Sequence, residues 1–241
     1  MNSELELYLE YTSKPWGMLT YRAVWSQLPH IVNSKILDFG SGFGTTANHL
    51  AKNNDVLAIE PNADMVEARI CENSYKQIIG SIEQLREQED NSFDVIVCHC
   101  VLEYLKERKD IFREFCRVLR PNGIISILKH NYAGKIMHQV VRENNTDQAT
   151  YLLNNGTINI MNFGEVNYYD INEMLEWAED IEISVEKIFG VRTFWDLQQN
   201  DSNKYEPNWV PKMIEMEMKV SHIDEFIKIS YFNHILLRKN R

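Results

Sequence analysis

The residues with the clearest chemical potential lie in one glycine-rich segment, Asp38-Phe39-Gly40-Ser41-Gly42-Phe43-Gly44. The segment follows a short apolar run that predicts a buried strand, and it precedes a stretch of helical periodicity. Its three glycines allow a tight turn and let a ligand lie against the backbone. The next apolar run ends in Glu60, where a carboxylate would meet ribose hydroxyls at the edge of a parallel sheet. Together these features predict a nucleoside-binding site.

The spacing of the glycines separates two classes of nucleoside cofactor. A dinucleotide fingerprint would place its third glycine three residues after the second, at position 45. Thr45 stands there, and Gly44 comes one position earlier. The pattern therefore argues against a nicotinamide dinucleotide.

The form Asp-x-Gly-x-Gly-x-Gly resembles the first motif of the Rossmann-like S-adenosylmethionine-dependent methyltransferases. Later segments resemble that family in the same order: Gly80-Ser81-Ile82-Glu83, then Phe93-Asp94-Val95-Ile96 leading to His99, and Val118-Leu119-Arg120-Pro121-Asn122-Gly123-Ile124. The resemblance covers residues 35–130. It implies S-adenosylmethionine as the cofactor and methyl transfer as the reaction.

The elements that must position these residues follow from the apolar pattern. Five short apolar runs alternate with helical stretches between Lys35 and Lys129, which is typical of parallel strands buried on both faces. Two late strands are expected at 181–191 and 226–238. The sequence therefore predicts an α/β fold with a doubly wound, mostly parallel seven-stranded sheet, N-terminal helices and a helical insertion after strand 5. A single domain is expected, with a helical cap (1–32), a cofactor-binding core (33–131), a substrate-side insertion (132–170) and the C-terminal part of the sheet (171–241).

A closer resemblance extends into the second half of the chain. The segments His99-Cys100-Val101-Leu102-Glu103-Tyr104, Asn131 with Gly134 and Met137-His138, and Gly190-Val191-Arg192-Thr193-Phe194 are similar to the tRNA 5-carboxymethoxyuridine methyltransferases. That group esterifies a wobble-uridine carboxylate. It implies cofactor contacts at Gly40, Ser41, Glu60, Ile82, Glu83 and His99, to which the glycine loop adds Asp38, Gly42 and Gly44.

One departure from that group concerns a cofactor-contacting arginine near the N-terminus. The group carries it in a Gly-x-Leu-Arg segment, whereas here Gly17-Met18-Leu19 continues with Thr20. Arg22 comes two residues later, and on a helix that displacement turns a side chain by roughly 200°. Arg22 therefore does not simply take over the role.

The acceptor side offers three candidate substrate-binding residues, Asn131, His138 and Arg192. The planar guanidinium of Arg192 is suited to gripping a carboxylate or phosphate at two points. A carboxylate acceptor is already ionised at neutral pH and needs no base, whereas a hydroxyl acceptor would need one. His99, His130 and His138 are the candidate bases, and no catalytic residue is singled out among them.

Composition limits the partners. The 241 residues carry 25 Lys and Arg against 35 Asp and Glu, a net charge of -10, so an RNA partner would need a local basic patch. The resemblance implies a tRNA as the methyl acceptor, and the net charge favours keeping an anionic small molecule as a nearly equal prediction. A small-molecule O- or N-methyltransferase and a catalytically silent cofactor-binding subunit remain alternatives.

No metal site and no membrane partner are expected. Neighbouring side chains in Cys98-His99-Cys100 point to opposite faces of a strand and cannot wrap one ion. The longest apolar runs are of strand length, and the acidic N-terminus lacks the features of a secretory signal, so a cytoplasmic location is predicted.

Overall fold

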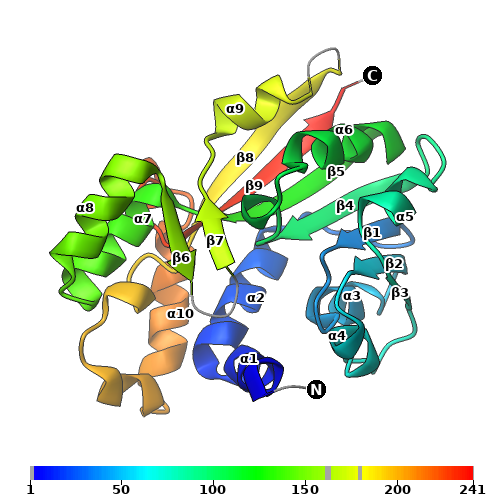
Figure 1. Cartoon of the computed structure of the whole chain (residues 1–241). Coiled ribbons are helices and arrows are strands. Elements are labelled where there is room, and N and C mark those ends of the chain that lie inside the picture. The colour runs from blue at the N-terminus through cyan, green and yellow to red at the C-terminus, as the bar shows by residue number, and fades with distance from the viewer. Residues whose placement is uncertain (1–2, 161–163, 179–180, 241) are drawn as a thin grey trace.

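The computed structural model of the chain describes residues 3–160, 164–178 and 181–240. A seven-stranded sheet crosses the molecule in the order β3-β2-β1-β4-β5-β9-β8 (Figure 1). Its neighbouring pairs from β3 to β5 are parallel, and β9 is antiparallel to both β5 and β8. The strands are Lys35–Phe39 (β1), Asp55–Glu60 (β2), Lys76–Ile79 (β3), Phe93–His99 (β4), Leu119–His130 (β5), Ile183–Val191 (β8) and Phe232–Lys239 (β9). The predicted doubly wound, mostly parallel seven-stranded sheet is confirmed.

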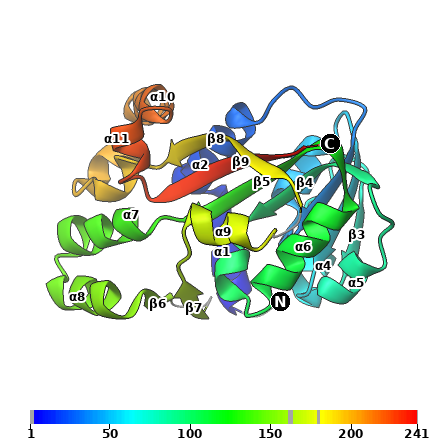
Figure 2. The ribbon, with the colours of Figure 1, turned by 90° about the horizontal axis from the view of Figure 1, so that it is seen from above.

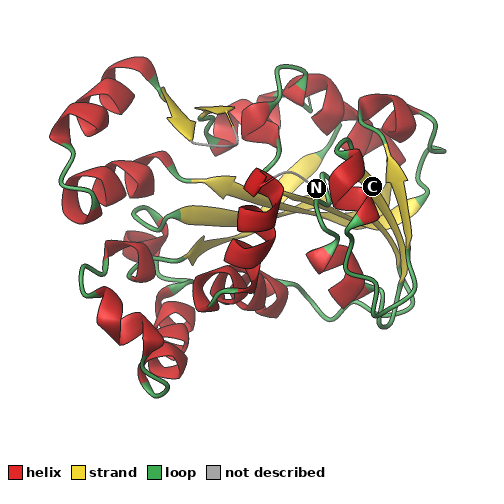
Figure 3. Ribbon diagram, turned by 60° about the horizontal axis from the view of Figure 1, so that its bottom comes forward, coloured by secondary structure: helices red, strands yellow, loops and turns green. Residues whose placement is uncertain are grey.

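Helices cover both faces of this sheet (Figures 2 and 3). On one face, apolar side chains of Ile82–Arg86 (α5), Arg108–Val118 (α6) and Ile171–Glu176 (α9) join a buried cluster with β1, β4 and β5. On the other face, Thr45–Leu50 (α3) packs on β1 and β2, and Pro15–Gln27 (α2) packs on β5, β8 and β9. The short helix Ala63–Glu67 (α4) follows β2, and Ser3–Ser13 (α1) precedes α2, so the predicted N-terminal helices are confirmed.

The carboxyl ends of β1 to β4 meet at one edge of the sheet, which brings their following loops together. Backbone N–H groups of Gly40 and Ser41 donate to Ile59 O at 2.8 and 3.1 Å, and Gly80 N–H donates to Glu60 O at 3.0 Å. The loops after β1, β2 and β3 are therefore tied to one another at the edge where a doubly wound sheet binds ligands.

The insertion after β5 contains more than helices. It begins with Tyr132–Met137 (α7), continues through a π-helical turn at His138–Arg142 and the helix Thr146–Asn155 (α8), and ends in an antiparallel pair, Thr157–Ile160 (β6) and Gly164–Asn167 (β7). In Figure 1 this part extends sideways from the sheet. The helix Trp209–Val220 (α10) follows later in the chain. The helical insertion is confirmed, and the small hairpin is an addition that the Asn-rich sequence did not predict.

The predicted strand at 226–238 is wrong in its first part. Asp224–Ile227 forms a helix (α11), and the strand begins only at Phe232. The alternation of apolar and polar residues from Phe226 to Ser230 imitates a strand, but main-chain N–H groups of Ile227, Lys228 and Ser230 donate to carbonyls three or four residues earlier in a helical pattern. Local hydrogen bonding therefore overrides the pattern.

Two further sequence-based expectations can be compared with the structure. No helix among the described residues is long and apolar enough to cross a membrane. All four cysteines are free thiols, and Cys98 lies in the core at 1% exposure, as expected for a packing residue.

Candidate functional site

The glycine loop between β1 and α3 adopts a backbone that other residues rarely take. Gly40, Gly42 and Gly44 have φ values of +73°, +55° and +73°. A Cβ atom on Gly40 would lie 2.3 Å from Val101 Cγ2, and one on Gly44 would lie 2.0 Å from the Tyr75 hydroxyl oxygen. Beside Gly42, by contrast, the nearest atom is Met65 Sδ at 3.9 Å. The first and third glycines are thus required by packing, whereas the open space at the second is available to a ligand.

Glu60 at the end of β2 holds the loop from the neighbouring strand. Its Oε2 accepts the Gly42 N–H at 2.7 Å and its Oε1 accepts the Asn62 N–H at 2.9 Å. Burial raises the pKa of the Glu60 carboxyl, while the bonds from Asn62 and Gly42 oppose that rise. Each carboxylate oxygen has a second lone-pair direction, so the group can still accept ribose hydroxyls.

Asp38, the last residue but one of β1, lies 3% exposed beneath the loop. Its Oδ2 is buried and has no hydrogen-bond partner. Burial raises the pKa of this carboxyl to about 7, against the opposing effect of a hydrogen bond from the Ala47 backbone. A buried, unpartnered carboxylate oxygen suits a cationic ligand, and S-adenosylmethionine carries both a sulfonium and an ammonium group.

Asp38, the loop and His99 line one cavity of about 60 Å³, which Tyr8 of α1 and Tyr21 of α2 close from above. Sites for ligands of nucleoside size are typically about 300 Å³ or more. The cavity is therefore smaller than the whole of a nucleoside-sized ligand. A wider, open hollow lined by Asn53, Asp55, Asp94 and Arg120 lies at the amino ends of the strands, on the opposite edge from the loop.

The other predicted cofactor residues lie around the same edge. Ile82 is buried and Glu83 is exposed at the start of α5, directly after the Gly80 turn that contacts Glu60. His99 ends β4, and its Nε2 lies 2.8 Å from Ser126 Oγ, which in turn lies 2.8 Å from His234 Nε2. Burial lowers the pKa of His99 to about 3, so this ring is a neutral hydrogen-bonding wall of the cavity and a poor base.

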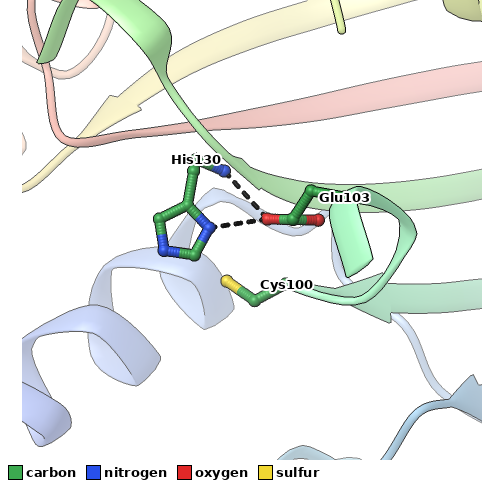
Figure 4. A group of neighbouring side chains, drawn as sticks. All are labelled: Cys100, Glu103 and His130. Atoms are coloured by element: carbon green, nitrogen blue, oxygen red, sulfur yellow. Dashed lines mark hydrogen bonds and ion pairs between the residues drawn. The ribbon is translucent and has the colours of Figure 1, made fainter. Parts of the chain in front are cut away.

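A buried carboxylate and a buried imidazole, Glu103 and His130, form a hydrogen-bonded pair (Figure 4). Glu103 Oε1 accepts hydrogen bonds from His130 Nδ1 at 2.7 Å and from the His130 backbone N–H at 3.1 Å. Burial raises the pKa of Glu103, but the bonds from His130 outweigh it and the pKa is lowered. A carboxylate at Nδ1 can hold a ring proton there and orient the imidazole so that Nε2 is free to accept one, which is the arrangement of a general base.

The Cys100 thiol lies close to this pair, so that Cys100, Glu103 and His130 offer three ligand atoms within 4.8 Å of one another. The Glu103–His130 hydrogen bond already uses two of those atoms, and burial raises the pKa of the Cys100 thiol well above its ordinary value. A protonated thiol beside a hydrogen-bonded pair is a weak metal site.

Comparison with known proteins identifies the reaction. A family model described as a methyltransferase domain matches residues 37–127, the stretch that holds the loop, Glu60 and His99. The chain is an S-adenosylmethionine-dependent methyltransferase. A tRNA 5-carboxymethoxyuridine methyltransferase of Escherichia coli is 24% identical over 92% of this chain and 89% of its own length. A human thiol S-methyltransferase is 32% identical, over 39% of this chain and 42% of its own.

Solved structures agree with the fold of the methyltransferase. An S-adenosylmethionine-dependent methyltransferase described as putative, from Listeria monocytogenes, superposes with a TM-score of 0.65 at 14% identity, covering 93% of this chain and 98% of that one. One from Mesorhizobium loti superposes with a TM-score of 0.58, also at 14% identity, over 92% and 98% of the two chains. These likenesses confirm the Rossmann-like architecture.

Two of the predicted acceptor-binding residues of the methyltransferase, Asn131 and Arg192, have hydrogen-bond partners within the chain. The Asn131 amide donates to the carbonyls of Lys228 and Ser230 at 3.0 and 2.8 Å, so an acceptor contact would have to use its oxygen. The guanidinium of Arg192 grips Asp196 at two points, with Nε to Oδ2 at 2.8 Å. The two-point grip expected of Arg192 is therefore present, but its carboxylate belongs to the protein.

Thr20 and His138 complete the comparison with the predicted site. Thr20, which stands where the resemblance expects an arginine, accepts a hydrogen bond from Arg192 Nη1 at 3.4 Å. His138 begins the π-helical turn after α7, and its Nδ1 is buried without a hydrogen-bond partner. Burial, with the nearby Lys135, Arg192, Arg142 and Lys204, lowers the pKa of His138 to about 4, so the ring is neutral at pH 7 and a poor base.

Three functional side chains were missed by reasoning from the sequence. Glu103 stands in the quoted segment 99–104, but its partner His130 is 27 residues away. Glu217 of α10 accepts the N–H groups of Thr193 and Trp195 at 2.6 and 2.7 Å and so fixes the turn that follows β8. Lys135 looks in the sequence like an exposed helical lysine, yet it is 8% exposed. Of these, only Glu103 had a signal in its local sequence.

Proposed function

We propose that this methyltransferase transfers the methyl group of S-adenosylmethionine to the carboxylate of a modified wobble uridine in tRNA. The supporting observation is the share of the chain that each similarity covers. The match to the E. coli tRNA 5-carboxymethoxyuridine methyltransferase covers 92% of this chain, including the acceptor half after residue 131, whereas the match to the human thiol S-methyltransferase covers 39%. Acceptor specificity resides mainly in loops and insertions added to the shared core, so similarity there carries more weight.

In this proposal the core at 33–131 binds the cofactor and the insertion at 132–170 faces the acceptor. Glu60 would bind the ribose hydroxyls, Asp38 would face the positive end of the cofactor, and the Gly42 backbone would allow close approach. Ile82, Glu83 and His99 would contact the remaining parts of the cofactor, as the sequence analysis predicts. The cofactor supplies an electrophilic methyl carbon, so the task of the protein is to align the carboxylate oxygen with it. A tRNA acceptor also agrees with the predicted cytoplasmic location.

A second candidate is a hydroxyl acceptor on a small molecule, and the Glu103–His130 pair favours it. A hydroxyl must lose its proton as the methyl group arrives, and the carboxylate-oriented imidazole provides a base for that step. His99 and His138 do not compete for this role, because burial lowers the pKa of both rings.

A defined substrate distinguishes the two candidates. We expect methyl transfer from labelled cofactor to an anticodon stem-loop carrying 5-carboxymethoxyuridine, and none to the same stem-loop carrying the corresponding amide. A His130→Gln variant should retain most of this activity, since a carboxylate needs no base. No transfer to the acid stem-loop, together with transfer to a small-molecule hydroxyl that His130→Gln lowers roughly a hundredfold or more while the cofactor stays bound, would instead indicate base catalysis and a hydroxyl acceptor.

A further inference from the structure

Lys135 of α7 is a buried ammonium without a carboxylate partner among the described residues. Its side chain is 8% exposed, and its polar contact is the Tyr231 hydroxyl, 3.3 Å from Nζ. The ammonium also lies 5.5 Å from the centre of the Tyr231 ring. Burial lowers the pKa of Lys135, which shows the cost of keeping this charge away from water. A buried charge normally persists only with a counter-charge.

Three other cations belong to the same cluster around His138, and each of them forms an ion pair. Arg192 binds Asp196, and both Arg142 and Lys204 bind Asp201. All three of these cations, together with Lys135, lie close enough to His138 to lower its pKa. The cluster therefore contains more positive charge than its local ion pairs neutralise, because Arg142 and Lys204 share Asp201. Among these four cations, Lys135 is the one for which the described residues provide no ion pair.

His138, one helical turn after Lys135, supplies a second unsatisfied group. Its Nε2 lies 3.5 Å from Glu143 Oε1, and its Nδ1 is buried without a partner. With Nε2 protonated toward Glu143, the Nδ1 lone pair would accept an N–H or O–H group. The His138 side chain is 17% exposed, so the cluster reaches the surface on this side.

Tyr231 connects this cluster to the rest of the acceptor side. Its ring centre lies 5.3 Å from that of His138 and 6.0 Å from that of His130. His130 is paired with Glu103, and that pair lies beside Cys100, the residue after the cavity-lining His99. The unpaired ammonium is therefore connected to the cofactor cavity through a short series of side-chain contacts.

We propose that Lys135 binds the carboxylate of the methyl acceptor, with His138 Nδ1 accepting a hydrogen bond from an N–H or O–H group of the same molecule. The proposal rests on the proposed carboxylate acceptor and identifies the residue that recognises it. It replaces Arg192, whose guanidinium is engaged by Asp196. One carboxylate oxygen would pair with the ammonium, and the other would remain available for the methyl group.

The test is calorimetric binding of the nucleoside 5-carboxymethoxyuridine, and of its neutral amide, to protein saturated with S-adenosylhomocysteine. Wild type should bind the acid more tightly than the amide. Lys135→Met should weaken binding of the acid roughly tenfold to a hundredfold and leave binding of the amide unchanged. The matched control is Lys52→Met, an exposed lysine beside the hollow at the opposite edge of the sheet, which should bind both as wild type does.

Melting curves of the ligand-free proteins separate this role from a structural one. Because Lys135→Met removes an unpaired buried charge, its melting temperature should equal or exceed that of wild type. Lys135→Gln, which keeps a polar side chain, should show the same loss of acid binding and serves if the Met variant does not fold. Equal binding of acid and amide by wild type, or unchanged acid binding by both variants, would overturn the proposal.

Failure of the proposed function would give a different result. In that case the acid would bind in a Lys135-dependent way, but no methyl group would be transferred to the tRNA stem-loop. The site for an anion would then stand, and the physiological acceptor would be another carboxylate.

Discussion

At the scale of single residues, the cofactor site combines two carboxylates in different environments. Glu60 is tied by two backbone N–H groups, whereas Asp38 Oδ2 has no partner. The first is suited to holding a fixed position at the ribose, and the second to meeting positive charge that arrives with the cofactor. Without a bound cation, one oxygen of the Asp38 carboxylate therefore has no interaction that offsets the cost of its burial.

Asp38→Asn should change how stability depends on pH. The pKa of Asp38 is raised to about 7 in the folded protein from its ordinary 3.8, so the folded state holds a proton that the unfolded state has lost between these values. Wild-type stability should therefore fall as pH rises from 4 to 7, and this part of the fall should disappear in Asp38→Asn. Urea unfolding of both ligand-free proteins across this pH range measures the dependence of stability on pH. Parallel stability profiles would contradict the assignment.

Glu60→Ala should weaken cofactor binding roughly tenfold to a hundredfold, because charge-assisted hydrogen bonds to the ribose are lost. It should also lower the melting temperature, since the N–H groups of Gly42 and Asn62 lose their acceptor. Calorimetry well below the melting temperature separates the two effects. The exposed Glu83 provides the control, because Glu83→Ala should leave the melting temperature unchanged. A folded Glu60→Ala protein with wild-type affinity would rule out the ribose role.

At the scale of elements, the sequence predicted the strands and the loop of the cofactor half, but it did not predict the side-chain contacts of the acceptor half. Strands β1, β2, β4 and β5 are largely buried and appear as apolar runs, whereas the edge strand β3 is partly exposed. The glycine loop stands at the end of β1. The acceptor side is instead defined by contacts between distant segments, such as Glu103 with His130 and Glu217 with Trp195. Arg192 was predicted to grip an acceptor because its partner Asp196 lies in a short helix that the local sequence pattern does not predict.

The turn after β8 depends on α10 through Glu217. Glu217→Ala would leave the N–H groups of Thr193, Phe194 and Trp195 without their acceptor and should destabilise the protein by about 3 kcal/mol. Cofactor affinity should be nearly unchanged, because the turn belongs to the acceptor side. Urea unfolding and cofactor calorimetry on the same variant check both parts. Unchanged stability, or a selective loss of cofactor binding, would contradict this account.

At the scale of the whole molecule, the proposed function divides the chain into a cofactor core and an acceptor side formed by the insertion, the β8 turn and the start of β9. The N-terminal helix α1 contributes Tyr8 to the cavity that Asp38 and the glycine loop line. This arrangement allows the acceptor side to vary while the glycine loop and the carboxylates keep their geometry.

The most direct test of the central claim is mass spectrometry of the products formed from cofactor labelled in its methyl group. Total tRNA and a pool of small metabolites should be incubated separately with the protein. We predict label in a wobble uridine, released by mild alkali as expected for a methyl ester. Label that resists alkali, or label found in the metabolite pool and absent from tRNA, would contradict a tRNA carboxylate as the acceptor.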